Sequence, residues 1–313
     1  MTGTRKGTYK ITNWRKYNES LVKRGSITFW FSGDTIDNWH HTNARPKVGH
    51  PFIYSDVAVE CMLVLREQFQ LPYRQTEGLG KSLAELMQIT IDIPDYTSLA
   101  KRAAKMGVSL DVRKHTGSID VVVDSTGLKV FGEGEWKMRK HGKTKRRTWR
   151  KLHLAINPDT HEIVAETMTE NSCDDAGQTD GLLDQVKAKV GKFYGDGAYD
   201  QQKVYKTLKK RGIKAVIPPR RNAKISRHGN SRGRPLTRDV AIREIRRRGR
   251  RQWKERVGYH RRSLSETAMY RMKCCFGDHL KNRLIQNQKI ETRLRCKILN
   301  HFNHLGLPLF EWN

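Results

Sequence analysis

The chain has 313 residues and a formal net charge of +29, from 61 Lys and Arg against 32 Asp and Glu. This length allows two domains with a sizeable core, and the charge excess calls for a polyanionic partner, of which nucleic acid is the expected one. We find no signal peptide, no apolar run of about 18 residues and no C-x-x-C pair, so we expect a cytoplasmic protein without a membrane partner or a zinc site.

Residues 1–115 are predicted to form a mostly helical DNA-binding domain. Apolar side chains recur at a spacing of three to four over Ile11–Arg24 and Ser55–Phe69, which is the period of a helix packed on one face. A third helix is expected over Tyr73–Met87. These helices come before any segment with the period of a strand.

A helix-turn-helix element is predicted at about residues 73–107. Pro94 and Asp95 form a helix-start signal, so a further helix is expected after a short turn. A second helix with cations on its exposed faces fits a recognition helix, although an ordinary solvated helix has the same pattern. The cations expected to contact DNA here are Lys101, Arg102 and Lys105.

From Ser118 the hydrophobic pattern changes to that of strands. Ile119–Asp124 is a β-branched run that we expect to end at Asp124. Trp149–Ile156 and His161–Met168 flank a turn at Asn157–Thr160, so these two strands are expected to form a hairpin.

Helices and strands then alternate. Helices are expected over Gly177–Ala188 and Gln201–Arg211, and strands over Val190–Tyr194 and Lys214–Ile217. Three strands followed by helix, strand, helix, strand and a late helix is the order of an RNase H-like, retroviral-integrase-type α/β domain with a mixed sheet. We place this domain at residues 116–280, with a basic insertion at 219–258, and expect a basic tail over 281–313.

Two basic segments interrupt the α/β pattern. Lys137–Lys151 holds nine Lys and Arg and no acid, and Pro219–Arg262 holds seventeen against three acids. Internal blocks of like charge are costly unless phosphates neutralise them, so we expect both to contact DNA rather than to be only solvated. Arg232-Gly233-Arg234-Pro235 also matches a minor-groove AT-hook core, with a flexible loop as the alternative. The predicted contacts are Lys137, Arg139, Lys140, Arg146, Arg147, Arg150, Arg232, Arg234, Arg246, Arg247 and Arg250.

Three acids stand where this fold would bring them together. Asp124 is expected to end the first strand, Asp196 follows the fourth, and Glu266 lies on the late helix. Three hard oxygen donors that converge can bind two Mg²⁺ ions about 4 Å apart, and Mn²⁺ can replace them. Asp124 and Asp196 also suit turns, so each has a purely structural alternative.

Tyr259, Arg262, Glu266 and Lys273 form the pattern Y-x2-R-x3-E-x6-K. On one helix these residues would fall within a sector of about 60°, with a carboxylate for the metal and cations for DNA phosphates. The alternative is a capping box, in which the helix starts at Ser263 and Glu266 only closes its N-terminus.

The chain resembles the DDE transposases of bacterial insertion sequences, in particular the insertion-sequence-five family. The matching segments are residues 123–129, 131–136, 149–155, 196–200 and 259–273. The resemblance implies that Asp124, Asp196 and Glu266 are the metal-binding catalytic triad. It also implies that Tyr259, Arg262 and Lys273 assist at the flanking DNA phosphates.

The function expected from these patterns is that of a transposase. It would bind the terminal inverted repeats of its insertion sequence, cut the DNA strand and transfer it to target DNA, as a homodimer or larger assembly near a bacterial or archaeal nucleoid. One alternative is a catalytically silent DNA-binding regulator derived from a transposase, which would need no metal site. Another is an RNase H-like nuclease, which would cut without joining and would not need the Tyr-Arg-Glu-Lys spacing.

Overall fold

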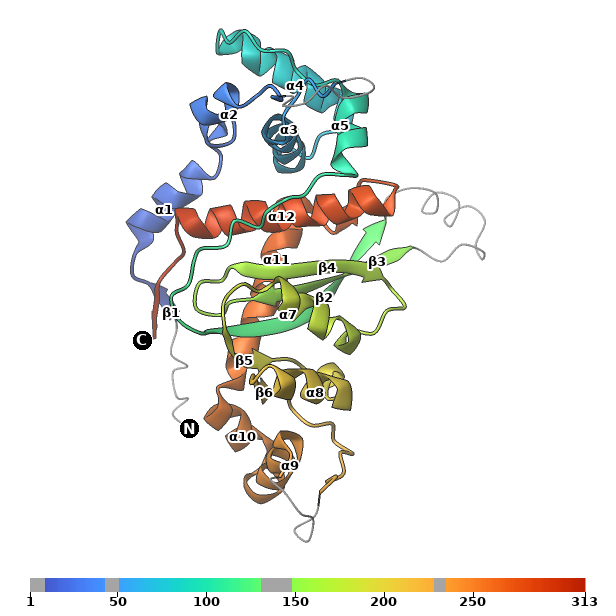
Figure 1. The fold of residues 1–313 in the computed structure, drawn as a ribbon. Coiled ribbons are helices and arrows are strands. Elements are labelled where there is room, and N and C mark those ends of the chain that lie inside the picture. The colour runs from blue at the N-terminus through green and yellow to red at the C-terminus, as the bar shows by residue number, and fades with distance from the viewer. Residues whose placement is uncertain (1–8, 43–50, 131–147, 228–234, 313) are drawn as a thin grey trace, which may run out of the picture. The chain divides into compact units, whose positions relative to one another are not determined.

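The computed structural model describes residues 9–42, 51–130, 148–227 and 235–312, and the chain divides into two compact units (Figure 1). The first unit comprises Met1–Gly107 and Ile298–Asn313, and the second comprises Val108–Lys297. The predicted boundary at residue 115 is therefore eight residues late. The last residues rejoin the first unit because β8 (Phe310–Trp312) pairs antiparallel with β1 (Tyr9–Ile11).

The first unit is helical, as predicted. Some of its helices begin at side-chain caps: Ser55 Oγ accepts a hydrogen bond from Ala58 N at 3.1 Å, and Asp95 accepts from the backbone N–H groups of Thr97 and Ser98. α3 supplies more of the buried apolar side chains of this unit than any other helix. The elements are α1 (Trp14–Lys23), η1 (Ile27–Phe29), α2 (Gly33–Asp37), α3 (Asp56–Gln68), α4 (Tyr73–Leu86) and α5 (Tyr96–Ala103).

The connection between α4 and α5 is longer than the short turn that we predicted. It runs over Met87–Asp95 and is packed rather than open. Trp39 Nε1 donates to Asp92 O at 2.8 Å, and Ile93 is buried. This segment is held by a hydrogen bond from Trp39, which is distant in the sequence. Local turn signals therefore did not reveal the length of the connection.

The second unit is built on a mixed sheet with the strand order β4-β3-β2-β5-β6. β2, β3 and β4 pair antiparallel, whereas β2, β5 and β6 are parallel, and β7 pairs with the far end of β2. This is the predicted RNase H-like arrangement. The strands are β2 (Ile119–Val130), β3 (Trp149–Ile156), β4 (Ile163–Glu170), β5 (Val190–Tyr194), β6 (Lys214–Val216) and β7 (His279–Leu280).

β2 does not end at Asp124, as we expected, but continues to Val130. The pairing with β5 stops at Val122 opposite Tyr194, while the antiparallel pairing with β3 continues as far as Lys129 opposite Trp149. Asp124 therefore lies inside a strand, at the point where one neighbouring strand has ended and the other has not.

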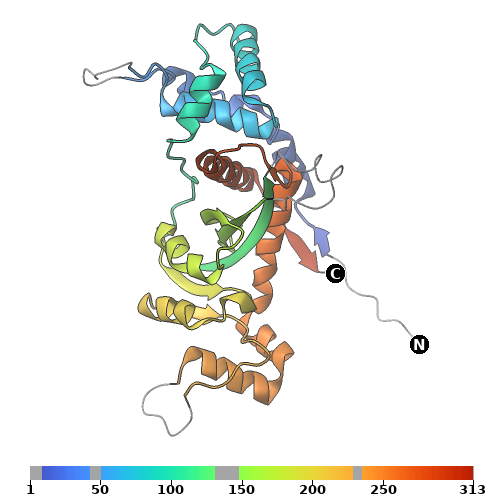
Figure 2. The same cartoon turned by 90° about the vertical axis from the view of Figure 1, so that its right-hand side faces the viewer.

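Helices cover both faces of this sheet (Figure 2). Val121 and Val123 point to the face packed by α7 and α8, whereas Val122 points to the opposite face with Tyr194, Trp253 and Tyr259. The alternation of β2 thus places Asp124 on the same face as Val122. The helical elements are η2 (Ala176–Gln178), α7 (Thr179–Gln185), η3 (Gly197–Tyr199), α8 (Gln202–Lys210), α9 (Thr237–Arg248), α10 (Arg250–Val257), η4 (Tyr259–Arg262) and α11 (Ser263–Phe276).

The segment predicted to be a basic tail is instead largely α12 (Ile285–Leu305). Some of its charged side chains are buried as an ion pair, and hydrophobic periodicity does not reveal such a helix. Glu291 and Arg295 are fully buried side chains joined by an ion pair at 2.5 Å, and Glu291 accepts from the backbone N–H of Lys281 at 2.8 Å. In the described parts of the chain, no helix is long and apolar enough to cross a bilayer.

Candidate active site

Asp124 and Asp196 come from neighbouring parallel strands. Val122 on β2 is level with Tyr194 on β5, and each Asp stands two residues further along its own segment. The β-strand rise is similar in both strands, so the two carboxylates leave the sheet side by side. The charge of Asp196 contributes to raising the pKa of Asp124, which agrees with this proximity.

The carboxylate of Asp124 is enclosed by donors. Oδ1 accepts from Ser125 N at 2.9 Å, and Oδ2 accepts from Arg262 Nη2 at 2.9 Å and from Ser265 Oγ at 3.0 Å. Burial raises the pKa of Asp124, and the positive charge of Arg262 with the hydrogen bonds opposes this only in part. Asp124 is thus a desolvated carboxyl, and a neighbouring cation stabilises its ionised form.

Asp196 is both a turn former and an acid at the site. Its Oδ1 caps η3 by accepting from Ala198 N at 2.8 Å, which is the structural role that the Gly-Asp-Gly context allowed. Oδ2 of the same side chain accepts no hydrogen bond from the described residues. One oxygen of Asp196 therefore orients the side chain, and the other is left for a ligand.

Glu266 does not close a capping box. α11 does begin at Ser263, but Ser263 Oγ donates to His260 O at 2.9 Å and the N-cap position carries no side-chain cap. Instead, Glu266 Oε1 accepts from Arg262 Nη1 at 2.7 Å, and its side chain is 61% exposed. The structure thus excludes the alternative in which Glu266 only closes the helix N-terminus.

The four motif residues do not form the stripe on a single α-helix that we predicted. Tyr259 and Arg262 lie on η4, a tighter 3₁₀ turn that leads into α11. Tyr259 is buried beside Trp253, and its pKa is raised by burial, with smaller contributions from the charges of Asp196, Asp124 and Glu266. η4 therefore packs the phenol ring against Trp253, and the predicted stripe on one helix was wrong.

Lys273 lies in the last turn of α11 and is half-buried. It stands seven residues beyond Glu266, which is about 10 Å along the helix axis. Among the described residues, its amine makes no ion pair. The structure therefore places Lys273 on the helix of Glu266 but away from Asp124 and Asp196.

Two residues that the sequence analysis missed anchor η4 to the sheet. Arg261 Nη1 donates to Asp120 Oδ2 at 3.0 Å, and its Nη2 pairs with Asp159 in the turn between β3 and β4. Asp120 and Asp124 share a face of β2, and they bind the consecutive residues Arg261 and Arg262. The sequence carried a signal for these contacts: two Asp residues four positions apart on one strand, and two consecutive Arg residues later in the chain.

Asp200 is a buried structural anchor and does not cap α8. The N-cap of α8 is Gln201, without a side-chain cap. Asp200 accepts from Arg238 Nε at 2.7 Å, from Arg238 Nη2 at 3.1 Å and from Arg220 N at 2.9 Å. The carboxylate therefore ties the turn after Asp196 to the basic insertion.

The donor set suits a hard divalent cation, because Mg²⁺ and Mn²⁺ bind carboxylate oxygens. Asp196 Oδ2 and Glu266 Oε2 accept no hydrogen bond from the described residues. In the described ranges, however, no group of three or more Asp, Glu, His or Cys is spaced to hold a metal ion. The guanidinium of Arg262 stands between Asp124 and Glu266. The residue types therefore fit a divalent cation, and the Arg262 guanidinium binds two of the three carboxylates.

The predicted DNA contacts fall into three groups. Lys101, Lys105, Arg246 and Arg247 are exposed cations. Arg102, Arg150 and Arg250 are at least partly structural, since they bind Asp56, Gln288 and Pro219 O respectively. The remaining seven lie outside the described residues: Lys137, Arg139, Lys140, Arg146, Arg147, Arg232 and Arg234.

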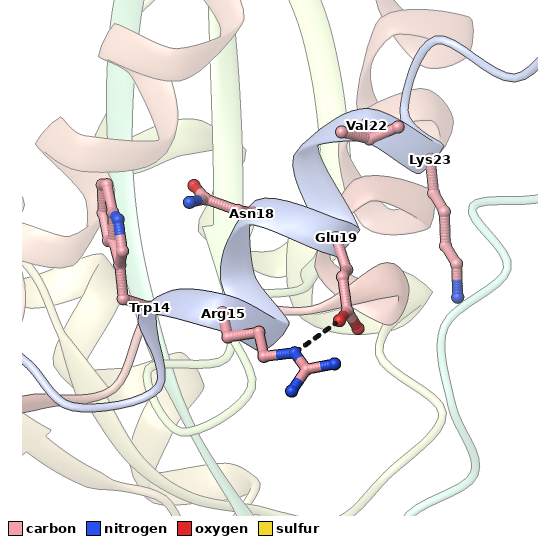
Figure 3. A pocket seen from close by; sticks show the side chains of 6 residues that line it. All are labelled: Trp14, Arg15, Asn18, Glu19, Val22 and Lys23. Carbon is pink, nitrogen blue, oxygen red and sulfur yellow. Dashed lines mark ion pairs between the residues drawn. The ribbon is translucent and has the colours of Figure 1, made fainter.

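A recess on α1 lies in the first unit and contains none of the predicted site residues. Its six lining side chains are drawn in Figure 3, where Arg15 and Glu19 form an ion pair at 3.4 Å. Trp14 and Val22, which are strongly exposed, supply its apolar surface. The lining residues are Trp14, Arg15, Asn18, Glu19, Val22 and Lys23.

Comparison with known proteins gives two family matches, each described as a transposase DDE domain. One model matches residues 22–133 and the other matches residues 115–301. The second match covers more than half of the chain and includes Asp124, Asp196 and Glu266. A solved structure described as "Crystal structure of the Mos1 mariner paired end complex with Mn" aligns with 86% of this chain and 88% of that chain, at 11% identity and a TM-score of 0.22. A TM-score of this size carries no argument about shared structure.

Proposed function

This chain belongs to the transposase DDE domain family, and from that premise we propose that it cuts DNA at the ends of an insertion sequence and joins the freed ends to target DNA. We assign Asp124, Asp196 and Glu266 as its catalytic carboxylates, and we place it in the insertion-sequence-five group by its Tyr-Arg-Glu-Lys spacing. The observation that carries the proposal is the parallel register of β2 and β5. This register sets Asp124 level with Asp196, on the face where Arg262 links Asp124 to Glu266.

The three carboxylates would hold two Mg²⁺ ions, or Mn²⁺ in their place, which supply a Lewis acid at the attacking and leaving oxygens. The protein's own groups orient the DNA strand. A tyrosine phenol keeps its proton at neutral pH, and burial raises the pKa of Tyr259 further, so it would donate a hydrogen bond to a phosphate oxygen. Arg262 and Lys273 contribute cations that attract the flanking phosphates.

We assign duplex DNA as the partner of both units. In the first unit, the exposed Lys101 and Lys105 on and after α5 would contact an inverted repeat. In the second, the exposed Arg246 and Arg247 on α9 would contact the DNA backbone. Joining two element ends requires a homodimer or larger assembly, and the reaction belongs in the cytoplasm where the nucleoid lies.

The test is strand cleavage and joining on duplex DNA that carries the flanking inverted repeat, with and without Mg²⁺. Wild type and Glu266→Ala are compared side by side. We expect nicking at the repeat boundary and a joined product that both require metal and Glu266. Tight repeat binding without cleavage in any divalent metal would instead support the catalytically silent regulator.

A further inference from the structure

We propose that Arg262 competes with a divalent cation for Asp124 and Glu266, and that metal binding releases its guanidinium to a DNA phosphate. The inference rests on the proposed function of these carboxylates and adds a role for Arg262 within it. Arg262 thereby sets the metal affinity of the site and links metal binding to DNA binding.

The competition follows from which atoms Arg262 occupies. Its two terminal nitrogens bind different carboxylates, Nη2 to Asp124 Oδ2 at 2.9 Å and Nη1 to Glu266 Oε1 at 2.7 Å. Ser265 Oγ lies 3.0 Å from the same oxygen and shares its one proton between Asp124 Oδ2 and Arg262 O, so Arg262 is the charged donor on Oδ2. A divalent cation bound to this oxygen would stand against the positive guanidinium, so the two cations compete for it.

Arg262 is the donor that can leave. Ser265 is fully buried and its hydroxyl also contacts Arg262 O at 2.8 Å, so its position is fixed by the helix. The Arg262 side chain retains 22% exposure, and its Nε has no hydrogen-bond partner among the described residues. Only the two terminal contacts hold the guanidinium in place.

The backbone of η4 can stay docked while this side chain swings away. The preceding residue, Arg261, is held by Asp120 on β2 and by Asp159 in the turn between β3 and β4. Displacement of Arg262 is therefore a change of side-chain rotamer and not a movement of α11. The released cation lies beside the carboxylates, where the DNA backbone would pass, and a guanidinium binds phosphate oxygens well.

Linkage makes this coupling reciprocal. A metal that frees Arg262 strengthens phosphate binding, and a phosphate that captures Arg262 strengthens metal binding by the same factor. The carboxylates would then bind the metal ion most tightly when DNA is bound, which is when the reaction needs it.

The test is calorimetric titration of MnCl₂ into the full chain without DNA, at about pH 8, where ordinary carboxyls are ionised. Wild type is compared with Arg262→Gln, Arg251→Gln and Asp124→Ala. Arg251 is the matched control because it forms the same i,i+4 pair with Glu255, at 3.1 Å on α10. We expect Arg262→Gln to lower the Mn²⁺ Kd about tenfold or more. Arg251→Gln should leave the Kd unchanged, and Asp124→Ala should remove binding.

The outcomes separate this inference from the proposed function. Equal or weaker Mn²⁺ binding by Arg262→Gln, with binding still lost in Asp124→Ala, overturns the competition but keeps the metal site. Absence of Mn²⁺ binding in every variant, Arg262→Gln included, removes the metal site itself.

Circular dichroism checks that each variant is folded. If Arg262→Gln is not, Arg262→Met serves in its place, because it keeps an aliphatic stem and removes both the charge and the hydrogen-bond donors. Its Kd should then lie below that of wild type, and an unchanged Kd contradicts the proposal.

Discussion

Arg238 donates two hydrogen bonds to the buried carboxylate of Asp200, at 2.7 and 3.1 Å. Asp200 stands four residues after Asp196, and Arg238 lies in the first turn of α9. The pair therefore fastens the basic insertion to the turn that carries one of the proposed catalytic acids. It is also the clearest case in this chain of an acid that is structural and not catalytic.

Removal of Asp200 should strongly destabilise the second unit. Asp200→Ala leaves Arg238 and the backbone N–H of Arg220 without their acceptor, and breaking a buried pair typically costs about 3–5 kcal/mol. Chemical unfolding of Arg251→Ala provides the comparison, since the exposed Arg251–Glu255 pair should contribute less than about 1 kcal/mol. Similar losses in the two variants would show that the Asp200 pair is not an anchor.

The stability from Asp200 should depend on pH. Burial acts to raise its pKa, but the hydrogen bonds and the charge of Arg238 outweigh burial and lower the pKa overall. A lowered folded-state pKa means that the stabilisation is fully present above the unfolded value, about 3.9, and is lost as pH falls through the folded value. The difference in unfolding free energy between wild type and Asp200→Asn should therefore shrink below about pH 4. A constant difference down to pH 2 would exclude this linkage.

Each of the three proposed catalytic acids should be separable from DNA binding. Asp124→Ala, Asp196→Ala and Glu266→Ala should each abolish strand cleavage while retaining the DNA, because cations make most of the phosphate contacts. Gel retardation and cleavage on the same duplex measure the two properties. Full cleavage by any one variant would remove that residue from the triad.

DNA binding should weaken steeply with salt, through phosphate contacts by exposed cations. The double variant Arg246→Gln with Arg247→Gln should reduce the slope of log affinity against log salt by about 2, since each lost phosphate contact removes about 1. Arg102→Gln is the contrast, because Arg102 is bound to Asp56 at 2.6 Å inside the first unit. A slope that is flat in wild type, or unchanged in the double variant, would show that these arginines do not bind phosphates.

Gly258 directly precedes η4, and a side chain at this position should destabilise the fold. It has φ of +68° between α10 and η4, a conformation in which an L-residue costs about 1–2 kcal/mol. Gly258→Ala should lower the unfolding free energy by about that amount. Gly78→Ala is the control: Gly78 lies inside α4 with nothing within 4 Å of an added Cβ, so it should gain about 0.5–1 kcal/mol. The same sign for both variants would contradict the prediction.

The strands of the second unit were predicted closely because their signals are local. Trp149–Ile156 and Val190–Tyr194 match β3 and β5 residue for residue. The end of β2 was wrong, because its length depends on pairing with β3 and β7 rather than on its own composition. α12 was missed for another reason. Glu291 and Arg295 are buried in it as an ion pair, and hydropathy does not identify charged residues as buried.

The sequence by itself determined the charge excess and the order of strands and helices, because both depend on composition and short-range periodicity. The resemblance to a known family predicted the roles of Asp124, Asp196 and Glu266 with their Tyr-Arg-Lys companions. Only the tertiary structure decided which cation meets which carboxylate. Arg262 lies between Asp124 and Glu266, Arg261 holds Asp120, and Arg238 holds Asp200. Apart from Arg262–Glu266, which is an i,i+4 pair, each of these ion pairs joins residues far apart in the sequence, so no local pattern specifies it.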